Sequence, residues 1–423
     1  MATRRKALWT STAGAALTLL PSGTLFGQKS PNQRLRIAVM GLSRGMAHVR
    51  SWQKVPNVEV AAICDVDEKR AAKGLEEVAK NGGQAKAEGD LCKILADPDI
   101  DVLSIAAPNH WHAPATLMAL AAGKHVYVEK PGSHNAAEAV QVARRTEETG
   151  LKVQLGTQRR SLPAYAEAVA RLREGVIGEV RTARCWYANA RGSIGTGQPA
   201  AVPPGLDYEL WQGPAPRRDF KDNLIHYNWH WHWHWGGGEL ANNGVHALDI
   251  ARWGLGVDLP DRVVCQGGRY HFEDDQETPD TIMAMYDFGG NKTISWEGSS
   301  CHPRKAEPLP FVKFYGDKGS LSLSTRSKFS IYDNAGQEIG KAEDEHWSDV
   351  PHFQNLADAI RDGVPLTADV RDSNHAATLC HLGNMAYRTG GSLDFDPATA
   401  SLRSNPAAEK LWAREYAKGW GIG

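Results

Sequence analysis

A short glycine-containing segment near the start of the chain could hold a pyrophosphate. The apolar run 35–40 leads directly into a loop that contains Gly41, Ser43, Arg44 and Gly45, and a helical stretch follows. Glycines between a strand and a helix present backbone N–H groups and the positive end of the helix dipole to a phosphate. Ser43 stands where the usual motif has its second glycine, and Gly45 is one residue early. The loop alone therefore does not identify a dinucleotide site.

A carboxylate after the next strand strengthens this interpretation. The β-branched run 58–64 ends at Asp65, close to the distance of roughly 20 residues from the first glycine that is typical of dinucleotide sites. A carboxylate there accepts hydrogen bonds from ribose hydroxyls and repels a 2′-phosphate, which favours NAD over NADP. The alternative is that Asp65 caps the following helix.

Apolar runs and helical segments alternate as far as residue 156. Strands are expected at 101–106, 125–128 and 152–155, and helices at 67–80, 113–122 and 136–149. This alternation predicts a doubly wound parallel sheet that binds its ligand at the carboxyl ends of the strands. The candidates for cofactor contact at these ends are Pro108, Asn109, His112, Glu129, Lys130 and Gln158.

The most unusual stretch is 226–235, in a chain whose 14 Trp outnumber its 11 Tyr and 9 Phe. If it is extended, its indoles face one side and its imidazoles the other. A sugar platform, a metal site completed by another ligand, and core packing with a half-exposed histidine face all remain open. Glycines at 236–238 also allow an irregular loop. The alternating residues are Trp229, His230, Trp231, His232, Trp233, His234 and Trp235.

These motifs together resemble the Gfo/Idh/MocA family of NAD(P)-dependent sugar oxidoreductases. The resemblance covers the chain after about residue 34 and rests on residues 107–112, 122–125, 129–131 and 244–249. It implies an α/β fold in which an N-terminal Rossmann doubly wound parallel sheet precedes a C-terminal α/β domain with an open, mostly antiparallel sheet. The expected domains are 34–156 for NAD binding and 157–350 for the substrate, with a helical segment at 351–423 packing back on the Rossmann domain. A homo-oligomer is also implied.

By position, Lys130 and His246 match the active-site lysine and histidine of that family. Alcohol oxidation needs a base within reach of the hydroxyl. A lysine in a dry pocket beside the nicotinamide has a lowered pKa, and a histidine titrates in the same range without help. Many family members carry aspartate where this chain has Asn242, whose amide can orient a hydroxyl but cannot take its proton. The proton relay is therefore expected on Lys130 and His246. For Glu239 two roles remain open, a substitute acid and a solvated or structural position.

The substrate face is expected to include residues from several segments. Arg159, Tyr187, Asn242 and His246 are candidates together with the tryptophan–histidine run, and Trp211 should border the same cleft. The ligand is expected to be a sugar or glycoside.

Charge and the N-terminus limit the partners and the location. With 48 Lys+Arg against 49 Asp+Glu, the chain lacks the basic excess typical of nucleic-acid binders, and it suits an uncharged substrate. Arg4 and Arg5 precede an apolar stretch that is too short to span a membrane. Residues 1–28 therefore resemble a twin-arginine export signal, which predicts a periplasmic or otherwise exported protein with no stable anchor; a basic, unstructured N-terminus is the alternative.

Three functions remain. The leading one is an NAD-dependent dehydrogenase that oxidises a ring hydroxyl, with C3 implied by resemblance to the exported branch of the family. The second is a redox-neutral glycosidase that works by oxidation, elimination, hydration and re-reduction; it would suit an exported enzyme that has no free NAD pool. The third is a sugar-binding protein without turnover, which the amide at Asn242 supports.

Overall fold

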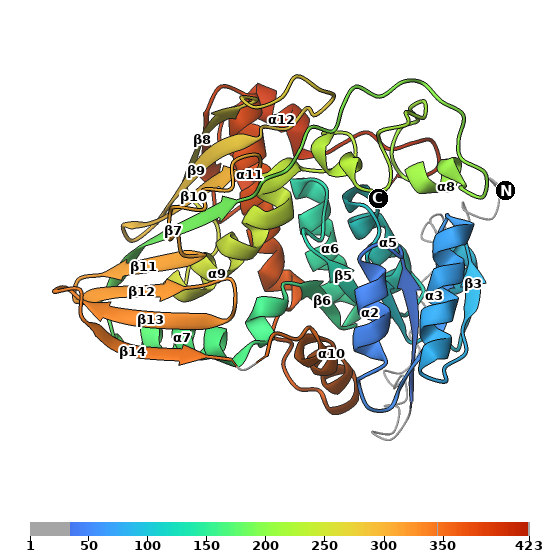
Figure 1. The fold of residues 1–423 in the computed structure, drawn as a ribbon, viewed down its shortest axis with the longest axis horizontal. Coiled ribbons are helices and arrows are strands. Elements are labelled where there is room, and N and C mark those ends of the chain that lie inside the picture. The colour runs from blue at the N-terminus through green and yellow to red at the C-terminus, as the bar shows by residue number, and fades with distance from the viewer. Residues whose placement is uncertain (1–33, 345, 422–423) are drawn as a thin grey trace, which may run out of the picture.

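The fold consists of two sheets with helices packed against them. We describe it from a computed structural model over residues 34–344 and 346–421. The expected export signal at 1–28 lies outside these residues. In Figure 1 the smaller sheet lies at the right and the larger at the left, with helices between them. None of the helices within the described ranges has the length and apolar character needed to cross a membrane.

The first sheet has six parallel strands in the order β3-β2-β1-β4-β5-β6. This order confirms the predicted doubly wound sheet. The sequence of strands runs outward from β1 to one edge and from β4 to the other, and such sheets bind their ligands at the point between these two strands. The strands are β1 (Leu35–Met40), β2 (Val58–Cys64), β3 (Lys86–Glu88), β4 (Val102–Ile105), β5 (His125–Glu129) and β6 (Val153–Gly156).

Most helices of this domain begin and end where their capping residues predict. The Asp67 carboxylate accepts a hydrogen bond from the Lys69 N–H and starts α3, and Asn135 caps α6 in the same way. The helix α5 differs from the prediction, because it begins at Asn109 rather than at 113. Pro108 occupies its N-cap, so the motif after β4 forms the buried first turn of a helix and not a loop. The helices are α2 (Gly45–Trp52), α3 (Glu68–Lys80), α4 (Leu91–Leu95), α5 (Asn109–Ala121) and α6 (Ala136–Thr149).

The second sheet has ten strands, and every pair in it is antiparallel except β7 with β10. It confirms the predicted open, mostly antiparallel sheet. On β9 the side chains alternate strictly, with Met283 and Met285 exposed and Ala284 and Tyr286 buried, so one face is covered and the other is open. The strands are β7 (Val180–Ala188), β8 (Arg262–Gly268), β9 (Thr281–Phe288), β10 (Lys292–Ser299), β11 (Val312–Gly316), β12 (Gly319–Leu323), β13 (Lys328–Asp333), β14 (Glu338–Glu343), β15 (Ser392–Asp396) and β16 (Ser401–Leu402).

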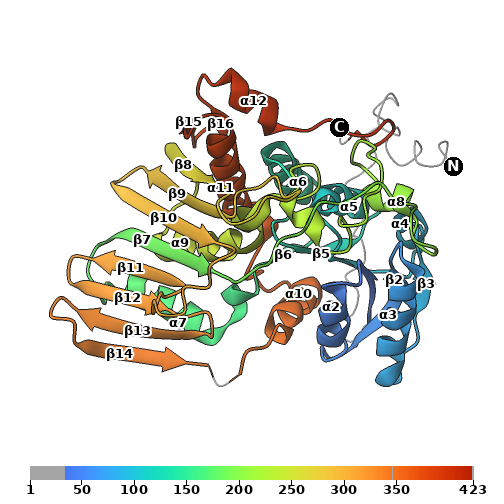
Figure 2. The ribbon, with the colours of Figure 1, turned by 45° about the horizontal axis from the view of Figure 1, so that its top comes forward.

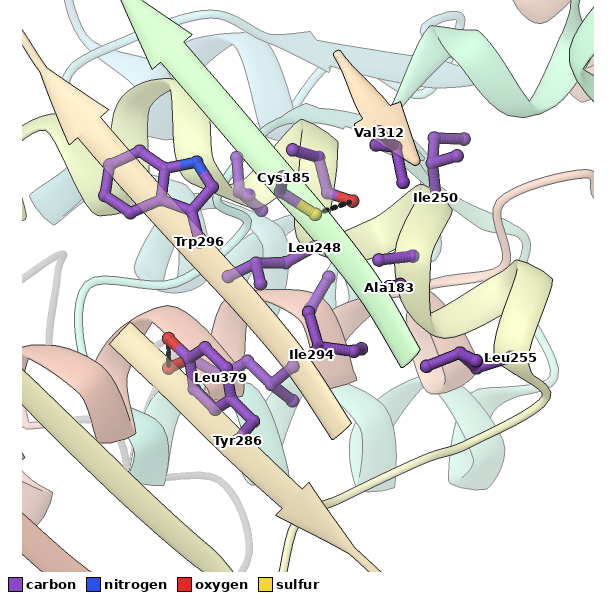
Figure 3. Close-up of a cluster of buried hydrophobic side chains, with 14 of the residues drawn as sticks. Ala183, Cys185, Leu248, Ile250, Leu255, Tyr286, Ile294, Trp296, Val312 and Leu379 are labelled. Atoms are coloured by element: carbon purple, nitrogen blue, oxygen red, sulfur yellow. Dashed lines mark hydrogen bonds between the residues drawn. The ribbon is translucent and has the colours of Figure 1, made fainter. Parts of the chain in front are cut away.

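Three helices cover the inner face of this sheet: α7 (Pro163–Arg173), α9 (Val245–Leu255) and α11 (Val370–Arg388). Figure 2 shows α11 between the large sheet and α6 of the Rossmann domain. In Figure 3, Leu248 of α9 lies between Trp296 and Ile294 of the sheet, and Ile250 of α9 lies beside Val312. Burial of these large side chains fixes the start of α9, which carries His246.

The C-terminal segment differs in part from the prediction. The helix α10 (Val350–Asp362) does pack on the Rossmann domain, where Phe353 stacks on Tyr127 with ring centroids 4.3 Å apart. However, β15 and β16 extend the large sheet, and α11 contacts both domains. The segment after residue 350 is therefore not wholly helical. Its last helix is α12 (Pro406–Trp412).

Candidate active site

A cavity of about 600 Å³ opens at the carboxyl ends of the Rossmann strands. We call it the main cavity. It brings together most of the residues singled out in the sequence, from both domains. The predicted residues that line it are Gly41, Ser43, Arg44, Asp65, Pro108, Asn109, His112, Glu129, Lys130, Gln158, Arg159, Trp211, Trp229, His230, Asn242 and His246.

The glycine loop forms a cradle that suits a dinucleotide phosphate. Gly41 has φ +84°, and a Cβ on it would lie 2.7 Å from both the Ala106 carbonyl oxygen and the Ala107 nitrogen. A side chain is therefore excluded both by conformation and by space. The helix α2 begins four residues later, so the positive end of its dipole follows the loop directly.

Gly41→Ala is expected to weaken NAD binding at least about tenfold and to lower stability by about 1–2 kcal/mol, the usual cost of a left-handed non-glycine residue. Gly82→Ala is the matched control, because Gly82 has φ +75° but no atom within 4 Å of an added Cβ. Calorimetric titration of both variants with NAD separates the loss of cofactor affinity from the loss of stability. Equal NAD affinities for the two variants would show that the Gly41 contact does not shape the cofactor site.

Asp65 and Ser43 complete the expected cofactor end. The Asp65 carboxylate accepts hydrogen bonds from the N–H groups of Leu42 (2.6 Å) and Asp67 (2.9 Å), and burial raises its pKa. It thus holds the glycine loop at the end of β2, where a ribose would lie. Arg70 donates to the Ser43 hydroxyl at 2.8 Å, so the residue in place of the second glycine is tied to α3. These residues fit an NAD molecule.

A buried charge network stands beside Lys130. Glu129 Oε1 accepts hydrogen bonds from Arg44 (3.0 Å) and Gln158 (3.0 Å) and lies 3.2 Å from His48 Nε2. Burial acts to raise the pKa of Glu129, yet Arg44 and His48 hold it well below its ordinary value. Burial lowers the pKa of His48. Arg44 also pairs with Asp349 at 2.6 Å, which links the glycine loop to the segment before α10.

Lys130 follows β5 and reaches the other domain. Its Nζ donates to the Asn242 carbonyl oxygen at 2.7 Å and to the Asn242 side-chain oxygen at 3.0 Å. Burial lowers the pKa of Lys130, while Glu129 opposes this shift. Because its hydrogen-bond partners are neutral oxygens and not a carboxylate, nothing in direct contact with Nζ demands the charged form. The lysine is therefore suited to accept a proton.

His246 lies at the N-terminus of α9, directly after η3, a turn of π-helix (Leu240–Gly244). Such turns are common at functional sites. Burial lowers the pKa of His246 well below its usual value, with contributions from Arg159 and Lys130. Its Nδ1 has no partner among the described residues. A neutral imidazole with a free ring nitrogen can share a proton with a bound hydroxyl.

Aromatic residues form the wall opposite the glycine loop. Trp229 and His230 stack with ring centroids 3.6 Å apart, and Tyr227 lies 4.6 Å from the His230 ring. Burial lowers the pKa of His230 to about 3, so the imidazole is neutral. The Arg159 guanidinium lies over the Trp347 ring at 5.2 Å. This wall offers flat apolar faces and few charges.

The run 226–235 is not extended, so the two-sided alternation does not apply, and the irregular loop that the glycines at 236–238 allow is the conformation found. It contains η2, a 3-10 helix at Asn228–Trp231, and its backbone bonds are local, as between His232 N–H and the Trp229 carbonyl. Successive side chains then rotate by about 120° and not by 180°. The indoles are drawn into separate clusters: Trp235 packs against Trp211 in a small core, and Trp231 lies beneath Arg191.

Two of the three interpretations, a cavity wall and core packing, therefore apply to different residues of this run. Trp229 and His230 line the main cavity, and core packing holds for Trp231 and Trp235, which are each 2% exposed. The remaining residues of the run, His232, Trp233 and His234, do not line the main cavity. The three histidines have separate partners and do not form one metal-binding face: His230 contacts the Tyr227 carbonyl, His232 lies near Glu277, and His234 contacts the Pro216 carbonyl.

Three further expectations require correction. Gly45 does not line the main cavity; a Cβ on it would lie 3.2 Å from Val39, so its role is close packing of α2 on β1. Tyr187 lies one layer behind the wall, where its hydroxyl accepts a hydrogen bond from Arg191, which also donates to Tyr227. Glu239 is buried against Arg191 and Ser300, and it does not line the main cavity.

Sequence analysis missed several lining residues. Arg70, Trp347 and Asp349 have no local motif, and the last two lie far along the chain from the glycine loop. His226 and Tyr227 belong to the run 226–235 but precede its alternating residues, which alone were expected at the substrate. Only the packing of α10 against α2 brings residues 347–349 to the cavity.

Comparison with protein families gives two matches that together span almost the whole described chain. The Gfo/Idh/MocA model for an oxidoreductase family with an NAD-binding Rossmann fold matches residues 35–157. The model for the C-terminal alpha/beta domain of that family matches residues 181–422.

Curated relatives match over part of their length. An inositol 2-dehydrogenase of Mycolicibacterium smegmatis is 32% identical over 195 residues, which are 45% of this chain and 50% of the relative. A scyllo-inositol 2-dehydrogenase (NAD(+)) of Bacillus subtilis is 34% identical over 34% of this chain and 42% of its own. The chain thus spans half or less of the length of these relatives.

Solved structures share the fold. A levoglucosan dehydrogenase in complex with NADH and levoglucosan has a TM-score of 0.67 at 20% identity, over 88% of this chain and all of the other. An aldose-aldose oxidoreductase from Caulobacter crescentus has a TM-score of 0.66 at 19% identity, over 86% of this chain and all of the other.

Proposed function

This chain belongs to the Gfo/Idh/MocA oxidoreductase family and carries its NAD-binding Rossmann domain; from that premise we propose that it oxidises a ring CH–OH group of a sugar or glycoside. The observation that carries the proposal is the position of Lys130. Its Nζ rests on the neutral oxygens of Asn242, in the same cavity as the glycine loop.

The chain's own residues supply the proton chemistry. The glycine loop and Asp65 would hold NAD, which would supply the acceptor for the hydride that leaves the substrate carbon. Lys130 accepts the hydroxyl proton, because burial favours its neutral form. His246, also neutral, orients the hydroxyl and shares the proton. Asn242 fixes the lysine through its two oxygens, so it positions the base rather than acting as one.

The shape and polarity of the wall support a ring-shaped, uncharged substrate. Trp229, His230 and Tyr227 present aromatic faces to the cavity, and indole stacks well on the C–H face of a pyranose. The relatives named above act on inositols, and one structural neighbour holds levoglucosan; all are polyhydroxylated rings. Oxidation at C3 rests on the resemblance to the exported branch of the family.

Asn242→Asp is expected to shift the rising limb of the pH–rate profile for oxidation to higher pH. The new carboxylate would contact Lys130 Nζ directly, stabilise the ammonium form and raise the pKa of the lysine. Since the base must be neutral, more alkaline solution is needed to reach the same rate. The profile of kcat/KM measures this shift. Asn334→Asp, an equal charge change in the β13–β14 turn, should leave the profile unchanged, and an unmoved limb in Asn242→Asp would remove Lys130 as the base.

The function is tested with the purified full chain. Its absorbance spectrum reports bound NAD(H), and incubation with aryl glycosides without any added electron acceptor reports bond cleavage. We expect ketosugar formation that needs an acceptor and leaves the glycosidic bond intact. Release of the aglycone over many turnovers without an acceptor would instead establish the redox-neutral glycosidase. Sugar binding without either product would establish a binding protein.

A further inference from the structure

A second pocket, of about 280 Å³, lies on the other side of the segment that forms the aromatic wall. Whereas Trp229 and His230 face the main cavity, Trp233 and His234 face this pocket. The other walls come from the start of α6, the end of α11 and the chain after α12. The residues that matter here are His134, Arg218, Trp233, His234, Arg388 and Arg414.

The pocket carries an excess of positive charge. Arg388 lies over the Trp233 ring at 4.9 Å, and burial lowers its pKa. Arg414 Nη1 donates to the His234 carbonyl oxygen at 3.2 Å, and burial lowers its pKa also. Neither guanidinium forms an ion pair with a carboxylate within the described residues. Arg388 is exposed and Arg414 is half-buried. A partly buried guanidinium without a counter-ion is costly, and an anion bound beside Arg414 would offset that cost.

The acidic groups nearby are engaged or exposed. Glu138 accepts hydrogen bonds from the His134 N–H at 2.6 Å and from the Tyr416 hydroxyl at 2.7 Å. Glu277 accepts one from the Trp233 N–H at 2.8 Å and pairs weakly with Arg218 at 3.8 Å. Glu415 lines the pocket with its side chain exposed. With Arg218 paired to Glu277, two unpaired arginines, Arg388 and Arg414, face one free carboxylate, that of Glu415.

His134 adds a donor that has no acceptor. Its Nδ1 lies 3.3 Å from Arg414 Nη1. Because a guanidinium can only donate, Nδ1 must accept, and burial lowers the pKa of His134 well below its usual value. The neutral ring then carries its proton on Nε2, a buried atom with no partner among the described residues.

We propose that this pocket binds a small anion-bearing ligand, a carboxylate or phosphate on a body about the size of a monosaccharide. Arg388 and Arg414 bind the anion, the His134 Nδ1 holds the Arg414 guanidinium in place, and the Trp233 ring packs on the ligand body. The ligand differs from the neutral ring expected in the main cavity. The proposal stands on the charges and contacts of the second pocket, so it does not depend on the proposed function.

The test is calorimetric titration of the full chain with D-glucuronate, inorganic phosphate and neutral D-glucose. At least one anion should bind. The Arg388 side chain is exposed and holds no ion pair, and Arg388→Gln should weaken the binding of that anion at least about tenfold. Arg414→Gln should do the same. Arg326→Gln, an equal charge change in the exposed β12–β13 turn, and Lys130→Met in the main cavity should leave the affinity unchanged.

Each outcome of this titration either supports or overturns the proposed anion site. Binding of glucuronate alone identifies a carboxylated sugar, and binding of phosphate as well identifies a phosphoryl group; either supports the pocket. Absence of binding by both anions up to about 10 mM, a range that still detects millimolar affinity, would overturn it. So would affinity that is unchanged in Arg388→Gln, or affinity that falls in Lys130→Met, which would place the ligand in the main cavity.

Discussion

Lys130→Met is expected to lower kcat for sugar oxidation by about 10²–10⁴-fold, the usual contribution of a general base. Methionine preserves the length and apolar stem of the side chain but cannot accept a proton. NAD should still bind, because the glycine loop and Asp65 are untouched. The loss of two hydrogen bonds to Asn242 should cost about 1–3 kcal/mol of stability, since a carbonyl oxygen loses its donor.

Two controls separate proton transfer from structural damage in this variant. Lys73→Met, on the exposed face of α3, should keep full activity. Small alkylamines should partly restore the rate of Lys130→Ala, because they can replace the missing base in the space left behind. Full activity of Lys130→Met, measured by steady-state kinetics, would exclude the lysine from the proton relay.

Glu129→Gln is expected to destabilise the folded chain by about 2–3 kcal/mol. Removing one partner of a buried ion pair costs about 3–5 kcal/mol when both charges are fully buried. The value here is smaller because the Arg44 side chain is 43% exposed and retains Asp349. Unfolding in urea at neutral pH measures the loss. Glu76→Gln, exposed on α3, should change stability by less than about 0.5 kcal/mol.

The same substitution should change how stability depends on pH. The pKa of Glu129 is depressed in the folded state, so its contribution is present above the unfolded pKa of about 4.3 and is lost as pH falls through the folded value. Wild-type stability should therefore fall more steeply than that of Glu129→Gln on acidification below about pH 5. Parallel curves would show that the carboxylate is not stabilised by Arg44 and His48.

The architecture could be predicted because each local signal agreed with the fold. The glycine loop, Asp65 and the residues after β5 all follow buried parallel strands, and such strands end at one edge of a sheet. Their convergence on one cavity follows from topology. Asn242 and His246 could be placed through the family resemblance, since the π-helical turn that orients them leaves no distinct pattern in the sequence.

What could not be predicted depends on tertiary packing. The tryptophan–histidine run has a period of two in sequence, yet it folds into a short 3-10 helix at Asn228–Trp231 followed by turns, and its indoles fill separate clusters. Arg44 was expected at the cofactor but also pairs with Asp349, about 300 residues away in the chain. Such long-range pairing leaves no local signal.

The most direct test of the central claim is a single turnover of the full chain, loaded with NAD, on a glycoside deuterated at the ring carbon that bears the C3 hydroxyl. Mass spectrometry of the cofactor then reports whether that hydrogen has moved. We predict that the recovered cofactor carries the deuterium in the wild type and that Lys130→Met slows its appearance by the factor given above. A cofactor that remains bound but unlabelled, with every ring position tested in turn, would contradict oxidation of a sugar in this cavity.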